Sequence, residues 1–290
     1  MRAGNLVLRI LVTGADGFTG RHFTQSATKA GHEAIALRAD LTSPAALAQE
    51  LTATQFDAVV HMGAISFVGH AGDRAFYDVN LFGTLNLLDA LKVLRRPLRK
   101  VLLASSANVY GNCEHSPISE VQPPAPVNHY AMSKLSMECM ARAMAPELPI
   151  VVTRPFNYTG PGQAPQFVVP KLVDHFRRRA KYIAMGNLHV HREYNDVRLV
   201  CEAYLRLLQA QTPQDCFNIC TGITYDFNAL ISTLESLTGH KMEVQVDPAL
   251  VRNNEVHRLC GDPTRLRAAV GDLQDYTLVD TLAWMLRSAS

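Results

Sequence analysis

Short apolar runs alternate with longer helical patterns through the first half of this chain. The runs are rich in leucine and β-branched residues, and five have the length of a buried strand: Leu6–Val12, Ala34–Arg38, Ala58–His61, Lys100–Ser105 and Ile150–Arg154. Strands that alternate with helices are typical of a parallel sheet covered by helices on both faces. The pattern therefore predicts an α/β fold built on a doubly wound parallel sheet.

The second half of the chain changes character after Arg154. Segment 157–162 has the composition of a loop, and the residues after it predict a helix over Val168–Arg179. The run Cys216–Cys220 predicts one more buried strand, followed by a helix over Phe227–Thr238. We therefore expect a smaller C-terminal subdomain, from which the chain returns once to the sheet.

Composition limits the kinds of partner. With 290 residues, 48% of them hydrophobic, the chain can bury the core of one large or two modest domains. The formal net charge of +2 is too small to bind a polyanion by bulk electrostatics, so a phosphorylated metabolite fits better than nucleic acid.

The sequence shows no evident targeting signal and no evident metal-binding motif. No apolar stretch reaches the roughly 18 residues of a membrane span, and Arg9 interrupts the apolar start of the chain, which argues against a signal peptide. The six cysteines show neither CxxC spacing nor a zinc pattern with nearby histidines. We therefore expect free thiols, no metal and a cytoplasmic protein without a membrane partner.

A glycine-rich turn directly follows the first predicted strand. Gly14, Gly17 and Gly20 recur at three-residue spacing where a helix begins. There, backbone N–H groups and the helix dipole can hold a pyrophosphate, and glycine lets the backbone approach it closely. The turn indicates a Rossmann-type dinucleotide site, although any tight turn between a strand and a helix can show this spacing. Its other residues are expected to share the cofactor contact: Asp16, Phe18 and Thr19.

The end of the second predicted strand bears on the choice of cofactor. A site for NAD usually offers a carboxylate there to the ribose 2′-OH, whereas this chain has Arg38. A guanidinium can bond a 2′-phosphate through two N–H groups, so Arg38 favours NADPH, with NADH as a possible substitute. The alternative is a solvated arginine. Asp40 and Leu41, just beyond, are expected to meet the adenine.

Tyr130 and Lys134 stand one turn apart on the same face of a predicted helix. A tyrosine ordinarily titrates near pH ~10, and an ammonium beside it in a cleft is expected to lower its pKa by about two to three units. The phenol would then be an acid at neutral pH. The same spacing is common on amphipathic helices, so the pair indicates a catalytic site only in combination with other motifs.

Such a motif stands at the end of the fourth predicted strand, at the sheet edge where open α/β folds bind ligands: Ser105–Gly111. Together with the glycine turn and the Tyr130 and Lys134 pair, it resembles the extended short-chain dehydrogenase/reductase family. Three further segments look like motifs of that family: His61–Ala64, Asn80–Leu88 and Arg154–Gln163.

The resemblance implies three catalytic roles. Ser106 would hydrogen-bond the substrate oxygen, Tyr130 would donate the proton, and Lys134 would hold the nicotinamide ribose and lower the pKa of Tyr130. Asn80 would support the site from the neighbouring helix. The cofactor would also contact residues after the third strand: Met62, Gly63 and Ala64.

The resemblance also implies a division of the chain. Residues 1–155 would form the NAD(P)-binding Rossmann domain, to which the chain returns around 196–222. Residues 156–290 would mainly form a smaller subdomain that binds a nucleotide sugar.

Members of this family act on nucleotide sugars as epimerases, dehydratases or reductases. Dehydratases place an acidic pair directly after the serine or threonine, where this chain has Ala107 and Asn108. Neither side chain exchanges a proton at neutral pH, so dehydration is not expected. Epimerases recycle NAD and usually carry a carboxylate in the place of Arg38, which favours a reductase.

Several segments of the second half are similar to the GDP-mannose dehydratase and GDP-4-keto-6-deoxy-mannose reductase branch: Phe167–Lys171, Gly186–Leu188, Arg192–Val197, Phe217–Gly222 and Arg252–Val256. In that branch four residues would hold the diphosphate and nucleoside, because cationic side chains bind phosphates through charge-assisted hydrogen bonds. They are Asn157, Lys171, Arg192 and Arg252. Other expected substrate contacts are Ser106, Asn108, Tyr130, Val168 and Glu255.

The implied reaction is NADPH-dependent reduction of the 4-keto group of a nucleotide-linked 4-keto-6-deoxy sugar. GDP-4-keto-6-deoxy-D-mannose would give GDP-D-rhamnose. Two alternatives stay open: the 6-deoxy-talose epimer as product, and a 4-epimerase of UDP- or dTDP-sugars with tightly bound NAD. A cofactor-sensing protein without chemistry is disfavoured, because Tyr130 and Lys134 are both present.

A homodimer is also expected, because in this family the helices that carry Asn80 and Tyr130 commonly pair with their copies. Apolar residues along both helices agree with such a contact. They are Leu81, Leu85, Leu88, Leu91 and Leu94 on the first helix, and Met132, Met137, Met140 and Met144 on the second.

Overall fold

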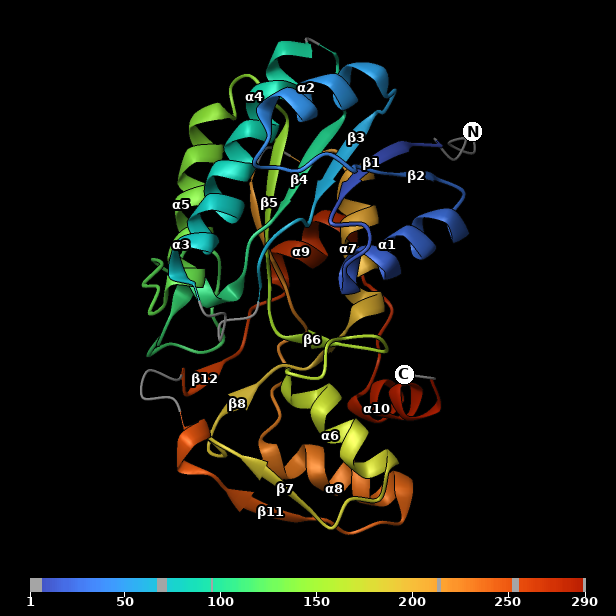
Figure 1. Cartoon of the computed structure of the whole chain (residues 1–290), viewed down its shortest axis with the longest axis vertical. Coiled ribbons are helices and arrows are strands. Elements are labelled where there is room, and N and C mark those ends of the chain that lie inside the picture. The colour runs from blue at the N-terminus through green and yellow to red at the C-terminus, as the bar shows by residue number, and fades with distance from the viewer. Residues whose placement is uncertain (1–6, 67–71, 95, 213–214, 252–255, 289–290) are drawn as a thin grey trace.

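The computed structural model describes residues 7–66, 72–94, 96–212, 215–251 and 256–288. Within these ranges, no helix is both long and apolar enough to cross a membrane. The elements form two groups, one around a large sheet and one beyond its edge (Figure 1).

Six parallel strands form the large sheet, in the order β10-β5-β4-β3-β1-β2. The strands are β1 (Arg9–Thr13), β2 (Glu33–Ala36), β3 (Ala58–His61), β4 (Lys100–Ala104), β5 (Ile150–Pro155) and β10 (Cys216–Ile219). The predicted doubly wound parallel sheet is thus confirmed. β2 lies on one side of β1 and β3 on the other, so the direction in which strands are added to the sheet reverses at β1. Open α/β sheets bind ligands at such a switch point.

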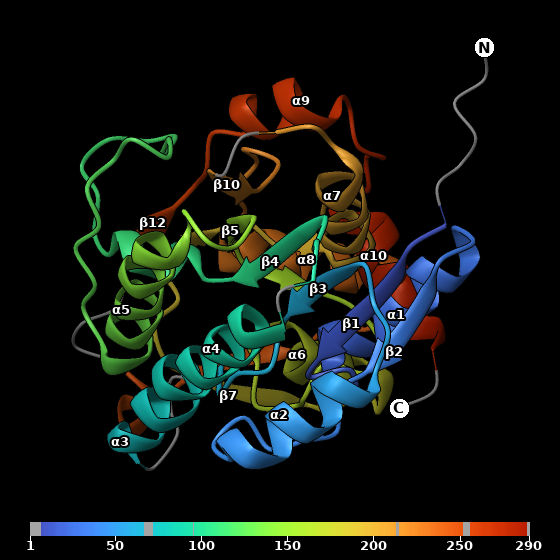
Figure 2. The same ribbon diagram turned by 90° about the horizontal axis from the view of Figure 1, so that it is seen from above.

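Helices cover both faces of the sheet (Figure 2). One face carries α1 (Phe18–Lys29), α7 (Val197–Gln209) and α9 (Thr264–Val270); the other carries α2 (Pro44–Ala53), α4 (Thr84–Leu94) and α5 (His129–Met144). Alternate residues of a strand point to opposite faces, so Ile10 and Val12 pack with the first set and Leu11 with the second. Burial on both faces explains why the strands are continuous apolar runs.

The second group lies beyond the carboxyl edge of the sheet, in the lower part of Figure 1. It contains α6 (Val168–Arg177), β7 (Tyr182–Met185), α8 (Phe227–Thr238), β11 (Glu243–Val246) and α10 (Leu278–Arg287). β7 and β11 pair in parallel. The three helices bury a separate apolar core that includes Leu172, Leu230 and Leu282.

Short elements complete the chain. Two-residue strands pair in parallel as β6 (Tyr158–Thr159) with β9 (Asn195–Asp196), and as β8 (His191–Arg192) with β12 (Arg258–Leu259). The remaining turns of helix are α3 (Asp73–Phe76), the π-helical η1 (Tyr77–Gly83), and the 3₁₀ turns η2 (Ala107–Tyr110) and η3 (Pro248–Leu250).

Some elements end earlier than the sequence predicts. β2 ends at Ala36, so Arg38 lies beyond the strand, and β4 ends at Ala104. The helix predicted to reach Arg179 ends at Arg177, because Arg179 adopts a left-handed φ of 53°. By contrast, β3 and α8 have the predicted bounds.

Two of the leucines expected at a subunit contact are buried in the core instead. Leu88 and Leu91 are buried between α4 and the sheet, and Leu81 and Leu94 pack against the same cluster. The prediction was wrong for Leu88 and Leu91, because α4 lies on the sheet and needs a broad apolar face there, whereas Leu81 and Leu94 stay partly exposed. Phe82, on η1, is 52% exposed.

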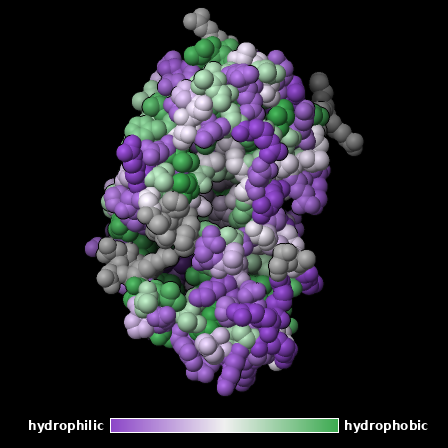
Figure 3. Space-filling model, in the orientation of Figure 1, coloured by the Kyte–Doolittle hydropathy of each residue, from purple (hydrophilic) through white to green (hydrophobic). Residues whose placement is uncertain are grey.

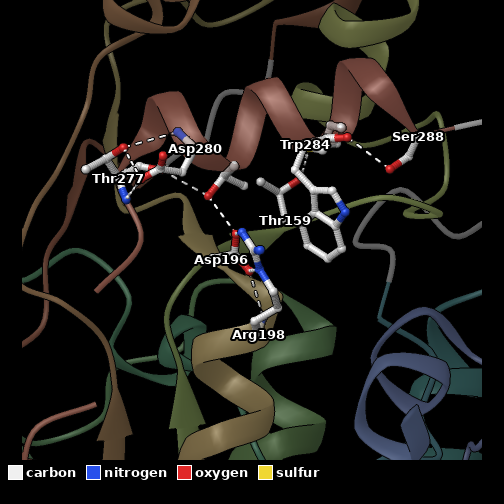
Figure 4. Close-up of polar contacts among 9 residues, drawn as sticks. Thr159, Asp196, Arg198, Thr277, Asp280, Trp284 and Ser288 are labelled. Atoms are coloured by element: carbon white, nitrogen blue, oxygen red, sulfur yellow. Dashed lines mark hydrogen bonds and ion pairs between the residues drawn. The ribbon is translucent and has the colours of Figure 1, made fainter. Parts of the chain in front are cut away.

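Asp196 joins the C-terminal helix to the start of α7 (Figure 4). Its buried carboxylate accepts hydrogen bonds from the Arg198 backbone N–H at 2.8 Å, the Arg198 guanidinium at 2.9 and 2.7 Å, and the Thr281 hydroxyl of α10 at 2.8 Å. The guanidinium lies 4.0 Å from the ring centre of Tyr276 and 4.1 Å from that of Trp284. One carboxylate thus caps α7 and holds α10 against it.

Replacement of Asp196 by Ala should lower the free energy of unfolding by about 2–4 kcal/mol, because the change removes a helix cap and leaves a partly buried guanidinium unpaired. Asp280→Ala is the matched control. Asp280 belongs to the exposed capping box of α10, whose loss should cost about 1 kcal/mol. Urea denaturation measures both variants, and equal losses would contradict the anchoring role of Asp196.

Candidate active site

The glycine turn lies between β1 and α1 and has no room for side chains at two positions. Gly14 has a φ of 68°, and a Cβ there would lie 2.9 Å from the backbone N and Cα of Gly63. A Cβ on Gly20 would lie 2.1 Å from the carbonyl oxygen of Gly14. Glycine is therefore required for the close approach of this turn to the end of β3, beside the free N–H groups that begin α1.

His61 fixes the end of β3 beside this turn. Its Nδ1 lies 2.7 Å from Thr13 Oγ1, which accepts the backbone N–H groups of Met62 and Gly63 at 3.1 and 2.9 Å. The Thr13 hydroxyl therefore donates to Nδ1, and Nε2 donates to Thr84 Oγ1 at 2.8 Å. Burial, and next the Lys134 charge, lower the pKa of His61 to about 3, so the ring is neutral.

Asn80 links the loop after β3 to α5. Its side-chain amide accepts from the backbone N–H of Ile65 at 2.9 Å and donates to the carbonyl of Ile65 at 3.1 Å. It also lies 3.1 Å from Ser133 Oγ, one residue before Lys134. Asn80 therefore lies behind the cavity described next and ties two of its walls together.

Ser106, Tyr130 and Lys134 line one cavity of about 430 Å³ at the carboxyl edge of the sheet. All three side chains are buried. Ser106 follows β4 and caps η2 by accepting the N–H of Asn108 at 3.2 Å. Lys134 donates from Nζ to the carbonyl of Ala104 at 2.7 Å. A hydroxyl, a phenol and an ammonium thus converge from β4 and α5.

The pKa of Tyr130 contradicts the sequence-based expectation. Burial raises it above its ordinary value, and the hydrogen bond with the Ser106 side chain opposes that rise only in part. The predicted lowering by Lys134 was wrong because burial disfavours the phenolate and the ammonium is bonded to Ala104. Burial lowers the pKa of Lys134 to about 8, against the opposing effect of the Glu138 carboxylate.

The cavity is lined by both groups of elements, and the face in Figure 3 is hollowed between them. Predicted residues in its lining are Gly14, Gly17, Phe18, Thr19, Gly20, Met62, Ala64, Ser106, Asn108, Tyr130, Lys134 and Asn157. Those outside the lining are Asp16, Arg38, Asp40, Leu41, Gly63, Asn80, Val168, Lys171 and Arg192. Arg252 and Glu255 fall outside the described residues.

Other lining residues were not foreseen: Ile65, Ser66, Gln163, Ala164, Gln166, Phe167, Tyr204 and Leu259. Segment 163–167 leads into α6, and a loop before a helix beyond the sheet edge is a signal that could have indicated it. Tyr204 and Leu259 carry no such signal, because α7 and β12 reach the cavity only through the tertiary fold.

Loop 157–163 closes one side of the cavity by binding the glycine turn and α1. Tyr158 Oη lies 2.8 Å from Thr19 Oγ1, and the Tyr158 and Phe18 rings stack with centroids 6.0 Å apart. Arg21 donates to the carbonyls of Asp16 at 2.6 Å and Gly162 at 3.1 Å. These contacts fix the second group of elements against the first helix of the sheet.

The predicted cations of the substrate side contact the backbone. Lys171 donates from Nζ to the carbonyl of Ala184 at 2.6 Å. Arg192 is buried and donates to the carbonyls of His191, at 3.0 Å, and Val256.

Arg38 is exposed and forms an ion pair with the exposed Asp16 of the glycine turn. The Glu50 carboxylate accepts the backbone N–H groups of Arg38 and Ala39. Asp40 accepts two bonds from Thr42, and these lower its pKa. A phosphate near Arg38 would therefore also meet carboxylates.

A family model described as GDP-mannose 4,6 dehydratase matches residues 35–285. One relative is GDP-6-deoxy-D-talose 4-dehydrogenase from Aggregatibacter actinomycetemcomitans, 34% identical over 277 residues that cover 94% of each chain. Another is GDP-6-deoxy-D-mannose reductase from Pseudomonas aeruginosa, 34% identical over 294 residues that cover 96% of each chain.

Two solved structures are similar over nearly the whole chain. RMD from Pseudomonas aeruginosa, complexed with NADPH, is 32% identical with a TM-score of 0.89 and covers 97% of this chain and 98% of its own. A Burkholderia cenocepacia protein, assigned provisionally as an epimerase, is 40% identical with a TM-score of 0.90 and covers 98% of each chain.

The buried neutral His61 predicts a pH dependence of stability. Between its ordinary pKa of 6.5 and its folded value of about 3, the unfolded chain binds a proton that the folded protein does not. The free energy of unfolding should therefore fall as the pH falls through this window, by up to about 1.4 kcal/mol per pH unit. His61→Gln keeps an acceptor for Thr13 and a donor for Thr84, so it should flatten this slope.

Urea denaturation at a series of pH values measures the slope. His189→Gln is the control, because His189 is exposed and should leave the slope unchanged. A His61→Gln protein with the slope of the wild type would show that His61 is protonated in the folded state.

Proposed function

Since the chain belongs to the GDP-mannose 4,6 dehydratase family, we propose that it is an NADPH-dependent oxidoreductase acting on a nucleotide sugar. It would reduce the 4-keto group of a 4-keto-6-deoxy sugar linked to GDP. The observation that carries this proposal is the convergence of Ser106, Tyr130 and Lys134 in one cavity beside the glycine turn. The names of both 34% relatives, a GDP-6-deoxy-sugar dehydrogenase and a GDP-6-deoxy-sugar reductase, support the choice of substrate.

Reduction is favoured over the dehydration named in the family description. Dehydration needs an extra acid and base in the site, and Ala107 and Asn108, which both line the cavity, can serve as neither. The described lining also contains the phenols of Tyr158 and Tyr204, but Tyr130 is the one that hydrogen-bonds Ser106, and Lys134 stands one turn from it on α5. One proton donor beside Ser106 is sufficient for a reduction, which needs a single proton delivered to an alkoxide.

The residues of the glycine turn fit a dinucleotide. The backbone contacts that exclude a Cβ at Gly14 and Gly20 hold the turn tightly against the N-terminus of α1. That N-terminus carries no side-chain cap, so its backbone N–H groups suit a pyrophosphate. Bound NADPH would supply a hydride to C4 of the sugar. Ser106 would hold the oxygen on C4 by a hydrogen bond, and Tyr130 would donate its proton to that oxygen. The raised pKa of Tyr130 suits a donor, because the phenol keeps its proton at neutral pH.

The remaining predicted contacts belong to this proposal. Arg38 would meet the 2′-phosphate of NADPH after it releases Asp16, and the other proposed cofactor contacts are Asp40, Leu41, Met62, Gly63, Ala64 and Asn80. Lys134 would hold the nicotinamide ribose. The nucleotide sugar would lie against Asn108, Asn157, Val168, Lys171, Arg192, Arg252 and Glu255. Residues 1–155, with 196–222, would then bind the cofactor, and residues 156–290 mainly the sugar nucleotide.

The product stereochemistry has two candidates. The relatives named for 6-deoxy-D-mannose and 6-deoxy-D-talose are equally identical to this chain, at 34%. GDP-D-rhamnose is our first choice, because segments of the second half resemble the GDP-4-keto-6-deoxy-mannose reductase branch, and the 6-deoxy-talose epimer, which the same residues could produce, is the second. The face of the sugar that meets the cofactor decides between them.

We further propose a cytoplasmic homodimer. All six cysteines are free, which agrees with a reducing compartment. Phe82 on η1 and Met132 on α5 are 52% and 38% exposed, whereas Met137 is buried. A pairing of these two helices with their copies would cover the exposed apolar side chains.

Tyr130→Phe should reduce turnover by about 10²- to 10⁴-fold, because it removes the proton donor and leaves the fold intact. The measurement is NADPH oxidation, followed by absorbance, on GDP-4-keto-6-deoxy-D-mannose generated in place by a dehydratase. Tyr182→Phe is the control, because Tyr182 is 55% exposed. Epimerisation of a UDP- or dTDP-sugar without any demand for NADPH would overturn the proposal.

The pKa of Lys134, about 8, predicts how the reaction depends on pH. Below this value the side chain is a cation that can hold the ribose, and above it the amine is neutral. The kcat/KM for reduction should therefore fall as the pH rises past about 8. Lys134→Arg stays charged, so any activity it retains should lack this basic limb. A wild-type rate that stays constant well above pH 8 would contradict the assignment.

A further inference from the structure

We propose that the buried ion pair between Glu138 and Arg154 is a positioning device for the active site. Arg154 of β5 orients the Glu138 carboxylate, which also binds Ser105 just after β4 and places a negative charge on the face of α5 that carries Tyr130 and Lys134. The inference rests on the proposed function only for the part of its test that measures turnover.

The first observation is the spacing along α5. Tyr130, Lys134 and Glu138 follow one another at four-residue intervals, so they share one face of the helix. All three are buried. Glu138 therefore lies one helical turn beyond Lys134 on α5, outside the cavity lining.

The second observation is the bonding of the carboxylate. Arg154, near the end of β5, donates from Nε to Oε1 of Glu138 at 3.0 Å and from Nη2 to Oε2 at 2.6 Å. Ser105 donates its hydroxyl to Oε1 at 2.5 Å. Since Lys134 binds the carbonyl of Ala104, α5 is tied to the end of β4 at two successive residues. Ser106 is the next residue of the chain, so its position depends on both ties.

The arrangement continues beneath η2. The Arg154 guanidinium lies 4.8 Å from the ring centre of Tyr110, whose hydroxyl donates to Asn218 Oδ1 at 2.7 Å. Tyr110 is the last residue of η2, the turn that also carries Asn108 of the cavity lining. The ion pair therefore joins α5, β5 and η2, three elements that carry residues next to the cavity.

Burial of an ion pair is not by itself a gain in stability, because desolvation costs about as much as the attraction returns. A pair of apolar residues could fill the same space. An ion pair adds direction, through paired hydrogen bonds, and charge. Both are useful next to a lysine that must stay protonated.

The charged and titratable groups around Lys134 come from three elements. Tyr130 and Glu138 lie on α5, His61 lies on β3, and Arg154 of β5 lies beyond Glu138. His61 is neutral, since its pKa is about 3. In the described part of the chain, Glu138 is the carboxylate that acts on Lys134, and it raises the pKa of Lys134 against the effect of burial.

The test compares Glu138→Gln with two other variants. Glu138→Gln keeps the shape and loses the charge, so the basic limb of kcat/KM should move to lower pH by about one unit. Ser105→Ala keeps the charge and loses one tie, so kcat should fall severalfold with KM and the limb unchanged. Cys139→Ser, at an exposed neighbouring position on α5, should change neither quantity.

A second readout needs no substrate. Between the folded pKa of Lys134, about 8, and its ordinary value of 10.5, the unfolded chain binds a proton that the folded protein lacks, so stability contributed by this group rises with pH. In Glu138→Gln this rise should begin about one pH unit lower than in Cys139→Ser. Urea denaturation across this range measures the shift.

The outcomes separate the two proposals. If the wild type shows no turnover but the stability curve shifts, the proposed function fails and the effect of Glu138 on Lys134 stands. The inference is overturned if, in Glu138→Gln, neither the pH dependence of stability nor the basic limb of kcat/KM moves. It is also overturned if Ser105→Ala keeps the full kcat of an active wild type. If Glu138→Gln is recovered unfolded, Ser105→Ala decides alone, and an unchanged kcat overturns it.

Discussion

The parallel direction of the six strands is the constraint on which the rest of this structure depends. Parallel strands end at the same edge of a sheet, so segments far apart in the sequence meet there. The glycine turn follows β1, Met62 follows β3, Ser106 follows β4, and Asn157 follows β5. The cavity at this edge then needs only α5 and the second group of elements to close it.

Polar groups buried behind that edge keep it in one arrangement. His61 bridges Thr13 and Thr84, Asn80 bridges Ile65 and Ser133, and the Glu138 and Arg154 pair lies beneath β4. Buried polar groups are costly unless they are bonded, and a fully bonded set allows few alternatives. In the part of the chain that the structure describes, Thr24 Oγ1 is the buried side-chain oxygen or nitrogen without a partner. The edge is therefore a satisfied polar layer between two apolar cores.

The sequence predicted the elements better than the lining of the cavity. Apolar runs reveal buried strands such as β3 because burial on both faces requires them. The choice of Arg179 as a helix end failed because a left-handed φ at a non-glycine residue leaves no pattern in the sequence. Phe167 and Leu259 reach the cavity from irregular segments, whose positions depend on tertiary contacts. The predicted direction of the Tyr130 pKa shift was wrong, because spacing along a helix reveals a neighbouring charge but not the depth of burial.

In the proposed reaction, a hydride is delivered to C4 of a GDP-linked keto sugar while this chain supplies the proton. The most direct measurement uses NADPH labelled with deuterium at the transferred position of the nicotinamide, with the GDP-sugar product analysed by NMR. Deuterium at C4 of a 6-deoxy sugar, with stoichiometric loss of label from the cofactor, is the predicted result. A product without deuterium, or a sugar whose configuration changes while the cofactor keeps its label, would contradict the account.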